Sequence, residues 1–231
     1  MVQINYVLGP ISKRVWTLAI ALVNPPADCP LCPRLVGFLE ECREKEPGWF
    51  NAPVPSFGDG DARLLIVGLA PGMKGANRTG RPFTGDFAGD LLYQTLLKFG
   101  LATGTYQARP DDGLELKDTL ITNAVRCLPP QNKPVGAEIK ACRQFLTGQI
   151  EALPDLRVIL ALGKIAHDSV VATLGHKLAQ FRFGHQAQHA VGGGLTLVDS
   201  YHCSRYNTNT RRLTTEMFEA VFRDVKMILK D

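Results

Sequence analysis

The sequence lacks the long hydrophobic run and the cleavage signal that mark membrane-bound or exported proteins. Its most suggestive segment is the apolar run Val15 to Val23, which Lys13-Arg14 precedes. That run is much shorter than the ~20 residues of a membrane-spanning helix. Asn24-Pro25-Pro26 follows it, where a signal peptide has small residues. We therefore expect an N-terminal helix packed on the core, and a cytoplasmic protein with no membrane partner.

The sequence also lacks a large excess of either charge and lacks a nucleotide-binding motif. The 26 Lys and Arg exceed the 22 Asp and Glu by a net charge of +4, which permits a nucleic-acid partner without requiring one. The absence of a G-x-x-x-x-G-K-[ST] motif and of a second acidic metal site argues against a nucleotide-binding protein. With 45% hydrophobic and 21% charged residues, we expect one globular domain over residues 1–231, and a monomer.

What the sequence does contain is an alternation of strand and helix patterns. Buried strands are expected at 64–67, 119–125, 156–162 and 195–199, and helices at about 91–99, 138–153, 164–174 and 214–230. Alternation implies parallel pairing with right-handed crossovers. The sequence therefore predicts an α/β fold, a three-layer α/β/α sandwich with a central, mainly parallel four-stranded sheet. Residues 175–194 are predicted to form an irregular connection with a short hairpin.

A glycine-rich segment, Gly68 to Asp86, follows the first of these strands. Its nineteen residues hold five glycines and two prolines, with Phe83 as the one aromatic and Asp86 as the one acid. Loops at the carboxyl ends of parallel strands form the ligand-binding edge of open α/β sheets, and glycine lets backbone N–H groups approach a ligand closely. The segment is therefore predicted to be a functional loop without secondary structure. Arg78 and Arg81 within it are candidates for phosphate contacts.

Four of the six cysteines have the spacing of metal ligands. Cys29 and Cys32 form a C-x2-C pair bounded by prolines, and Cys127 and Cys142 form a second pair far down the chain. In a cytosolic protein such pairs bind metal more often than they form disulfides. Four thiolates suit zinc or an iron–sulfur cluster, and spacing does not separate the two. The first 60 residues or so would then form a helical, metal-binding segment.

A polar cluster, residues 199–212, follows the last predicted strand. His202 comes directly after that strand, where it is placed to act as an acid, a hydrogen-bond donor or a metal ligand. Arg205 and Arg211 are candidates for phosphate contacts, and Tyr206 is a candidate for stacking or wedging against bases. Two basic loops are thus predicted at one edge of the sheet.

Asn123 is the remaining candidate, because it interrupts an otherwise apolar strand. An unpaired buried amide is costly. Its side chain is therefore expected either to satisfy backbone groups locally or to face a ligand.

Four motifs occur in order along the chain. They are Gly68-Leu69-Ala70-Pro71-Gly72, the run Asn77 to Asp86, the run Thr122 to Cys127, and a Ser-x-His-x-Ser-Arg-x-Asn-Thr pattern at residues 200–208. Together they resemble the iron–sulfur branches of the uracil-DNA glycosylase superfamily, families 4 and 5, and most closely family 5, type B. The resemblance covers nearly the whole chain from Cys29 onward. It implies a four-iron four-sulfur cluster, with zinc as the alternative, on Cys29, Cys32, Cys127 and Cys142.

The resemblance also implies a reaction, in which the N-glycosidic bond of uracil in DNA is hydrolysed and an abasic site remains. Phe83 matches the aromatic residue that stacks on the flipped base. Asn123 matches the amide that accepts from uracil N3–H and donates to O4, a pattern that cytosine reverses. His202 matches the donor near uracil O2, and Asp86 matches the acid that orients water or stabilises the cationic sugar.

The remaining implied roles concern binding. Backbone groups around Gly68, Ala70 and Gly72 would line the pocket. Hypoxanthine and xanthine are further candidate bases, and DNA containing deaminated bases is the implied partner.

Two departures qualify the resemblance. Leu69 stands where family 4 has Glu, which favours family 5, and Cys203 stands where the family usually has Pro. The altered residue after His202 keeps a second hypothesis open, a non-catalytic module that recognises damaged or abasic DNA.

Overall fold

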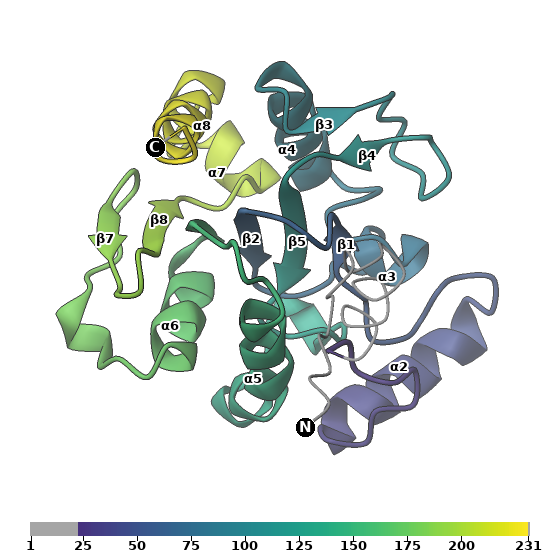
Figure 1. Cartoon of the computed structure of the whole chain (residues 1–231). Coiled ribbons are helices and arrows are strands. Elements are labelled where there is room, and N and C mark those ends of the chain that lie inside the picture. Colours follow the sequence, from purple (N-terminus) through teal and green to yellow (C-terminus); the bar gives the residue numbers. More distant parts are fainter. Residues whose placement is uncertain (1–22, 231) are drawn as a thin grey trace, which may run out of the picture.

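A six-stranded sheet forms the centre of the computed structural model, which describes residues 23–230 (Figure 1). The helix expected over Val15 to Val23 lies outside the described residues, apart from Val23 itself. The strand order is β1-β5-β2-β6-β8-β7. Its members are β1 (Phe57–Gly58), β5 (Thr119–Asn123), β2 (Leu64–Gly68), β6 (Val158–Leu162), β8 (Thr196–Ser200) and β7 (Gln188–Ala190).

The four inner strands run parallel, whereas β1 and β7 pair antiparallel at the two edges. The mainly parallel sheet is therefore confirmed, but its predicted size of four strands is wrong. The edge strands have only two and three residues, which is too short to show a periodic apolar pattern. The short hairpin expected within 175–194 is only half right: β7 lies in that segment, but its partner is β8, the last predicted strand, beyond residue 194.

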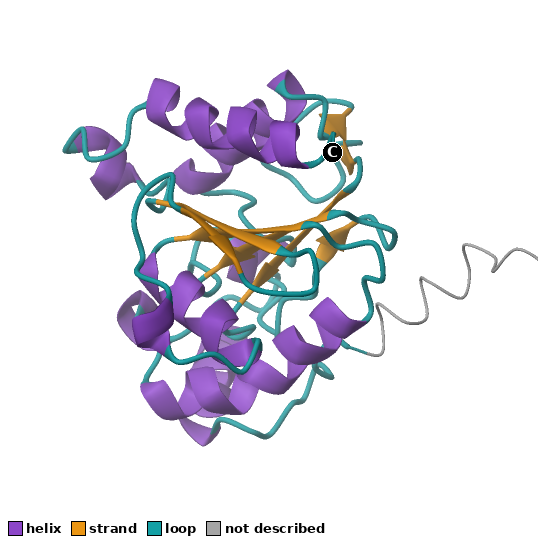
Figure 2. Ribbon diagram, turned by 60° about the vertical axis from the view of Figure 1, so that its left-hand side comes forward, coloured by secondary structure: helices purple, strands orange, loops and turns teal. Residues whose placement is uncertain are grey.

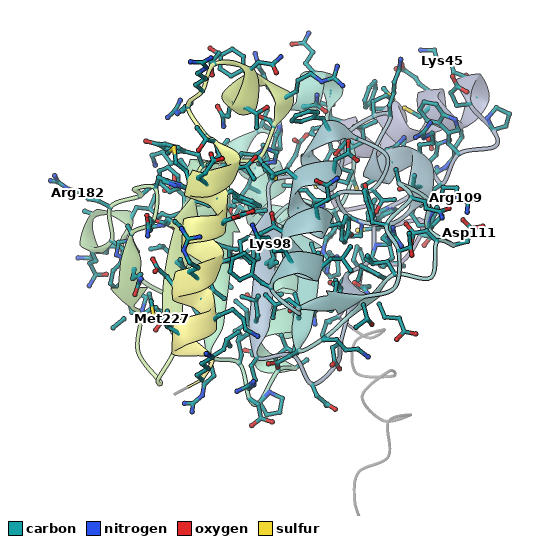
Figure 3. All side chains as sticks on the ribbon, turned by 90° about the horizontal axis from the view of Figure 1, so that it is seen from above. Lys45, Lys98, Arg109, Asp111, Arg182 and Met227 are labelled. Carbon is teal, nitrogen blue, oxygen red and sulfur yellow. The ribbon has the colours of Figure 1, made fainter. Side chains whose placement is uncertain are left out.

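Helices cover both faces of the sheet, as the α/β/α sandwich requires (Figure 2). On one face lie α4 (Phe87–Lys98) and α8 (Thr215–Ile228), which Lys98 and Glu219 join by an ion pair of 2.6 Å; Lys98 lies between the two helices in Figure 3. On the other face lie α5 (Gly136–Glu151) and α6 (Lys164–Thr173). Each face encloses its own apolar cluster, because alternate residues of buried strands point to opposite sides.

Smaller elements complete the described chain. The helix α2 (Pro33–Lys45) packs its buried Leu35, Leu39 and Cys42 beside the start of α5. Strands β3 (Ala102–Thr103) and β4 (Glu115–Leu116) form a separate pair. Two predicted loops each contain a short helix, α3 (Ala76–Thr79) and α7 (Arg205–Asn209). The expectation that the glycine-rich segment has no secondary structure is therefore wrong at α3. None of the helices in residues 23–230 is long and apolar enough to cross a membrane.

The order of the parallel strands determines where a ligand can bind. In chain sequence the order is second, first, third, fourth, the pattern of doubly wound sheets. In such sheets ligands bind outside the carboxyl ends of the strands. The segments that leave β2, β5 and β8 at that edge carry the three polar motifs of the sequence.

Candidate active site

A cavity of about 560 Å³ opens at the carboxyl edge of the sheet. Its walls come from the segments after β2, β5 and β8, which are far apart in sequence. The predicted site residues that line it are Ala70, Gly72, Phe83, Asp86, Asn123, His202 and Arg205. Parallel strands bring these segments to one place, as the sequence predicted. Lys74 and Asn132 also line the cavity, and sequence inspection had not singled them out.

Gly68 lies behind the cavity wall. It pairs in register with Asn123 on the neighbouring strand. A β-carbon at Gly68 would overlap both the Asn123 amide oxygen and the edge of the Phe83 ring. Only glycine therefore lets this ring and this amide come together beside the strand end. The Asn123 side chain makes no hydrogen bond to any residue in 23–230, so its amide is available to a ligand in the cavity.

Phe83 has a strained backbone. Its φ is +52°, a left-handed conformation that costs a non-glycine residue roughly 1–3 kcal/mol. Phe83 is buried, with only 7% of its surface exposed. Its ring lies against the His202 ring, with centroids 6.0 Å apart and planes inclined by 30°. Such strain persists only where surrounding contacts determine it, and it concentrates at functional sites.

Asp86 begins α4 as its N-cap residue. One carboxylate oxygen accepts a hydrogen bond of 3.2 Å from the Gly89 N–H. The other oxygen lies against Gly75 and Gly72, where added β-carbons would crowd it. Burial raises the pKa of Asp86, and the N–H groups of Gly89 and Ala88 oppose that rise. The geometry places an acid of raised pKa at the cavity wall.

His202 is a neutral imidazole at physiological pH. Burial lowers its pKa to about 4. Its backbone is held by the Asn207 amide, which donates to the His202 carbonyl at 2.8 Å. A neutral ring keeps one N–H donor, which is the form suited to stabilise negative charge on a leaving base.

Cys203 occupies the core rather than the cavity. It is fully buried, and its thiol donates to the Ala88 carbonyl at 3.4 Å. Burial, followed by the charge of Asp86, raises the pKa of Cys203 to about 12. The thiol is therefore protonated and packs beneath the start of α4.

Four of the five predicted DNA contacts are exposed. Arg78 lies on α3, Arg205 and Tyr206 lie on α7, and Arg211 lies in the turn after it. Tyr206 is 73% exposed, as a residue that stacks on an external partner must be. The assignment of Arg81 is wrong: the residue is 4% exposed, and both ends of its guanidinium bind Asp112 at 2.8 Å. A buried, paired guanidinium is not free to bind phosphate.

The four predicted metal ligands line one small cavity beside α2 and the start of α5. Burial raises the pKa values of Cys127 and Cys142 to about 12 and about 11, and the charges of Cys29 and Cys32 add to the rise in both. Beside them lies Arg126, which is 1% exposed. Its guanidinium donates to neutral oxygens only, on Val54, Asn24 and Ser56, within the described part of the chain.

A second group of ligand-type side chains had gone unrecognised in the sequence. His167, His189 and Asp199 meet on the sheet face that α6 covers. His167 Nδ1 lies 2.7 Å from an Asp199 oxygen, and its Nε2 lies 3.0 Å from the Phe181 carbonyl. Two ligands of one tetrahedral metal ion with bonds of ~2.0 Å stand about 3.3 Å apart. The shorter separation is that of a hydrogen bond, and the acceptors that face both nitrogens favour the doubly protonated form of His167.

Comparison with known proteins identifies relatives over most of the chain. The family model of the uracil DNA glycosylase superfamily matches residues 55–226. A type-5 uracil-DNA glycosylase of Thermus thermophilus is 45% identical over 214 residues, which cover 90% of this chain and 97% of that protein. Type-5 uracil-DNA glycosylases of Pyrobaculum aerophilum and Mycobacterium tuberculosis are each 40% identical, over 87% of this chain and over 89% and 78% of those proteins.

Proposed function

This chain belongs to the uracil-DNA glycosylase superfamily, and on that premise we propose that it hydrolyses the N-glycosidic bond of uracil in DNA, as a monofunctional enzyme of base excision repair. One observation carries the proposal: Phe83, Asp86, Asn123 and His202, from three separate segments, line a single cavity. The relatives are named for this activity. The product is DNA with an abasic site.

Base recognition is assigned to Phe83 and Asn123. An enzyme that acts on a base must remove it from the duplex and hold it in a pocket. The Phe83 ring supplies a flat apolar face. The Asn123 amide has no hydrogen-bond partner in residues 23–230, so it offers an acceptor to N3–H and a donor to O4. Cytosine presents the opposite pattern at these positions and is rejected. Hypoxanthine and xanthine stay candidate substrates.

The chemical step is assigned to His202 and Asp86. Bond cleavage leaves negative charge on uracil and positive charge on the sugar. The neutral His202 ring donates a hydrogen bond to the departing base. Asp86, ionised above its raised pKa, orients the attacking water or stabilises the cationic sugar. Both act in a partly buried cavity, where electrostatic interactions are stronger than in water.

DNA binding is assigned to exposed residues of α3, of α7 and of the turn that follows α7. Arg205 lines the cavity, and its guanidinium carbon lies over the Phe87 ring, 5.3 Å from the ring centroid. Arg78 is exposed on α3, Arg211 is exposed in the turn after α7, and Tyr206 is exposed on α7. Phosphate contacts position the duplex, while an aromatic side chain can stack on the bases around an extruded nucleotide.

The four clustered cysteines are proposed to hold a four-iron four-sulfur cluster. An all-sulfur donor set suits either this cluster or zinc. A buried Arg126 without an acidic partner in residues 23–230 fits an anionic centre, because four thiolates supply the missing negative charge. Bound there, the cluster would supply a structural cross-link among α2, the segment after β5 and α5. We assign it no step of the reaction.

Iron and zinc differ in how far apart they hold four thiolates, and metal analysis separates the two. Tetrahedral zinc with Zn–S bonds of about 2.3 Å brings its sulfurs to within ~3.8 Å of one another. Four thiolates that each bind a different iron of a cluster stand farther apart. Iron and sulfide analysis of the purified protein checks the proposed cluster, and a colourless protein with stoichiometric zinc would reject it.

One assay separates the enzyme from a non-catalytic DNA-binding module. Oligonucleotides that contain uracil, hypoxanthine or xanthine are incubated with the protein and treated with alkali, which breaks the strand at abasic sites. Alkali-labile breaks at uracil are expected. Tight DNA binding with no breaks at any base would favour the binding module. Cys203 gives that module no support, because its side chain is buried in the core and does not line the cavity.

A further inference from the structure

Arg81 is buried in an aromatic cage at the back of the cavity. Its guanidinium carbon lies 5.0 Å from the ring centre of Phe57, 5.3 Å from Tyr93 and 5.8 Å from Tyr106. Asp112 closes the cage with a two-pronged ion pair in which its side chain is fully buried. Asp111 and Arg109 of the same loop point outward (Figure 3). The loop therefore turns one carboxylate inward to meet Arg81.

The cage holds the backbone on both sides of Phe83. The Tyr93 hydroxyl donates to the Pro82 carbonyl at 2.6 Å, and the Arg81 Nε donates to the Thr84 hydroxyl at 2.7 Å. The Tyr106 hydroxyl lies 3.4 Å from the Phe83 carbonyl. That carbonyl also rests directly on Gly89 of α4, where no β-carbon would fit. The backbone is thus held at Pro82, at Thr84 and at the Phe83 carbonyl itself.

The strained φ of Phe83 supplies the reason for so many contacts. A left-handed phenylalanine relaxes unless its neighbours prevent it. Relaxation would rotate the ring away from Gly68, Asn123 and the cavity. Bidentate guanidinium–carboxylate pairs resist rotation, because two parallel hydrogen bonds fix both position and plane.

We propose that Arg81 and its cage are a positioning device, which locks Phe83 in its strained conformation so that its ring forms the preformed stacking face for the extruded base. The inference rests on the proposed function for the identity of that base. Arg81 touches neither the base nor the DNA. It acts through Phe83 alone.

The test is a double-mutant cycle in uracil excision under single-turnover conditions. Arg81→Gln is expected to lower the excision rate by roughly 10- to 100-fold, because small displacements of a positioning group are costly. Phe83→Ala lowers it as well. In the Phe83→Ala background, Arg81→Gln should then change the rate by less than about twofold, because the group that it positions is gone. A merely structural Arg81 would give additive losses.

Matched variants guard against general destabilisation. Tyr93→Phe removes one hydroxyl bond and keeps the ring, so it carries the same cycle if Arg81→Gln fails to fold. Arg63→Gln breaks a similar two-pronged pair with Asp118 at the opposite end of β2. It is expected to lower the melting temperature without slowing excision, while affinity for abasic-site DNA stays unchanged in all variants.

The outcomes are distinct. Wild-type protein that releases no uracil overturns the proposed function, and the positioning role with it. The positioning role alone is overturned if the wild type is active but Arg81→Gln and Tyr93→Phe slow excision by the same factor in the wild-type and in the Phe83→Ala background. The positioning role is supported if both substitutions slow excision only when Phe83 is present and Arg63→Gln does not slow it.

Discussion

The Asp86 carboxylate occupies the space that a side chain at Gly75 would fill. Gly75 immediately precedes α3. The glycine-rich segment therefore does more than let backbone approach a ligand. It makes room for its own terminal acid, which is folded back against the segment at the cavity wall.

Gly75→Ala should consequently act as a catalytic mutation although residue 75 has no side chain. We expect excision to fall about as far as in Asp86→Asn, because the methyl group displaces the carboxylate. Single-turnover rates of the two variants and of their combination measure this. Gly48→Ala is the control, since a β-carbon there meets nothing within 4 Å. Normal activity in Gly75→Ala would show that the position of the carboxylate is not critical.

The pH dependence of excision should reveal Asp86. Burial raises its pKa, and the ionised form is the active one, so activity is full above that pKa and falls as the pH decreases through it. The acidic limb should lie above the ordinary carboxyl pKa of about 3.9. Asp86→Asn should lose roughly 10²- to 10⁴-fold in rate, lack this limb and still bind DNA. A limb that persists unchanged in the variant would assign it to another group.

His202 should act without titrating near neutrality. Its pKa of about 4 leaves it neutral across the physiological range, so no limb near the usual histidine pKa of about 6.5 should appear. His202→Ala is expected to slow uracil release by about 10²- to 10³-fold, the cost of losing one donor to a developing anion. His176→Ala, whose ring instead contacts the Val191 carbonyl, serves as the control. Wild-type rates in His202→Ala would remove the donor role.

The local pattern of apolar residues made the inner parallel strands of the sheet predictable. Runs such as Leu64–Val67 identify buried parallel strands, and parallel strands bring Phe83, Asn123 and His202 to one edge whatever the details of the loops. The edge strand Phe57–Gly58 could not be foreseen, because two residues carry no periodicity and its pairing with Leu120 and Ile121 is non-local.

Arg81 shows why one site assignment failed. Beside Arg78 in a polar loop, it has the sequence features of a phosphate contact. Its partner Asp112 lies 31 residues away, in a loop without regular pattern, and its cage comes from several elements. The same holds for His167 and Asp199, which are 32 residues apart. Long-range polar pairs leave no periodic signal in a single sequence.

Loss of the charge at Arg126 should weaken the metal centre. Arg126→Met keeps most of the volume and removes the buried cation that faces the thiolates of Cys127 and Cys142. We expect less iron and sulfide per protein and faster loss of visible absorbance when a chelator is added. Arg63→Met is the control, because Arg63 lies at the start of β2 and pairs with Asp118. Equal iron content and equal chelator resistance in both variants would reject the counter-ion role.

The His167–Asp199 pair should make stability depend on pH. Burial lowers the pKa of His167, but the hydrogen bond and charge of Asp199 outweigh burial and raise it above 6.5; the Phe181 carbonyl and Asp168 act in the same direction. A raised histidine pKa contributes stability that is complete below the unfolded value and is lost as the pH rises through the folded value. The free energy of unfolding should therefore decrease between about pH 6 and about pH 9. His189, on the other oxygen of Asp199, is the remaining titratable neighbour.

Urea unfolding at the two pH values tests this, with His167→Gln and Asp199→Asn beside the wild type. Asp199→Asn should cost about 3–5 kcal/mol near neutral pH, because a buried charge loses its partner. His167→Gln should remove the decrease on the alkaline side, since the group that releases the proton is gone. Lys164→Gln, which breaks an exposed pair with Asp168 on the same helix, should leave the pH dependence largely intact. A wild-type stability that stays level or increases over this range would show that His167 is neutral in the folded protein, with one of its two nitrogens facing an acceptor without a proton.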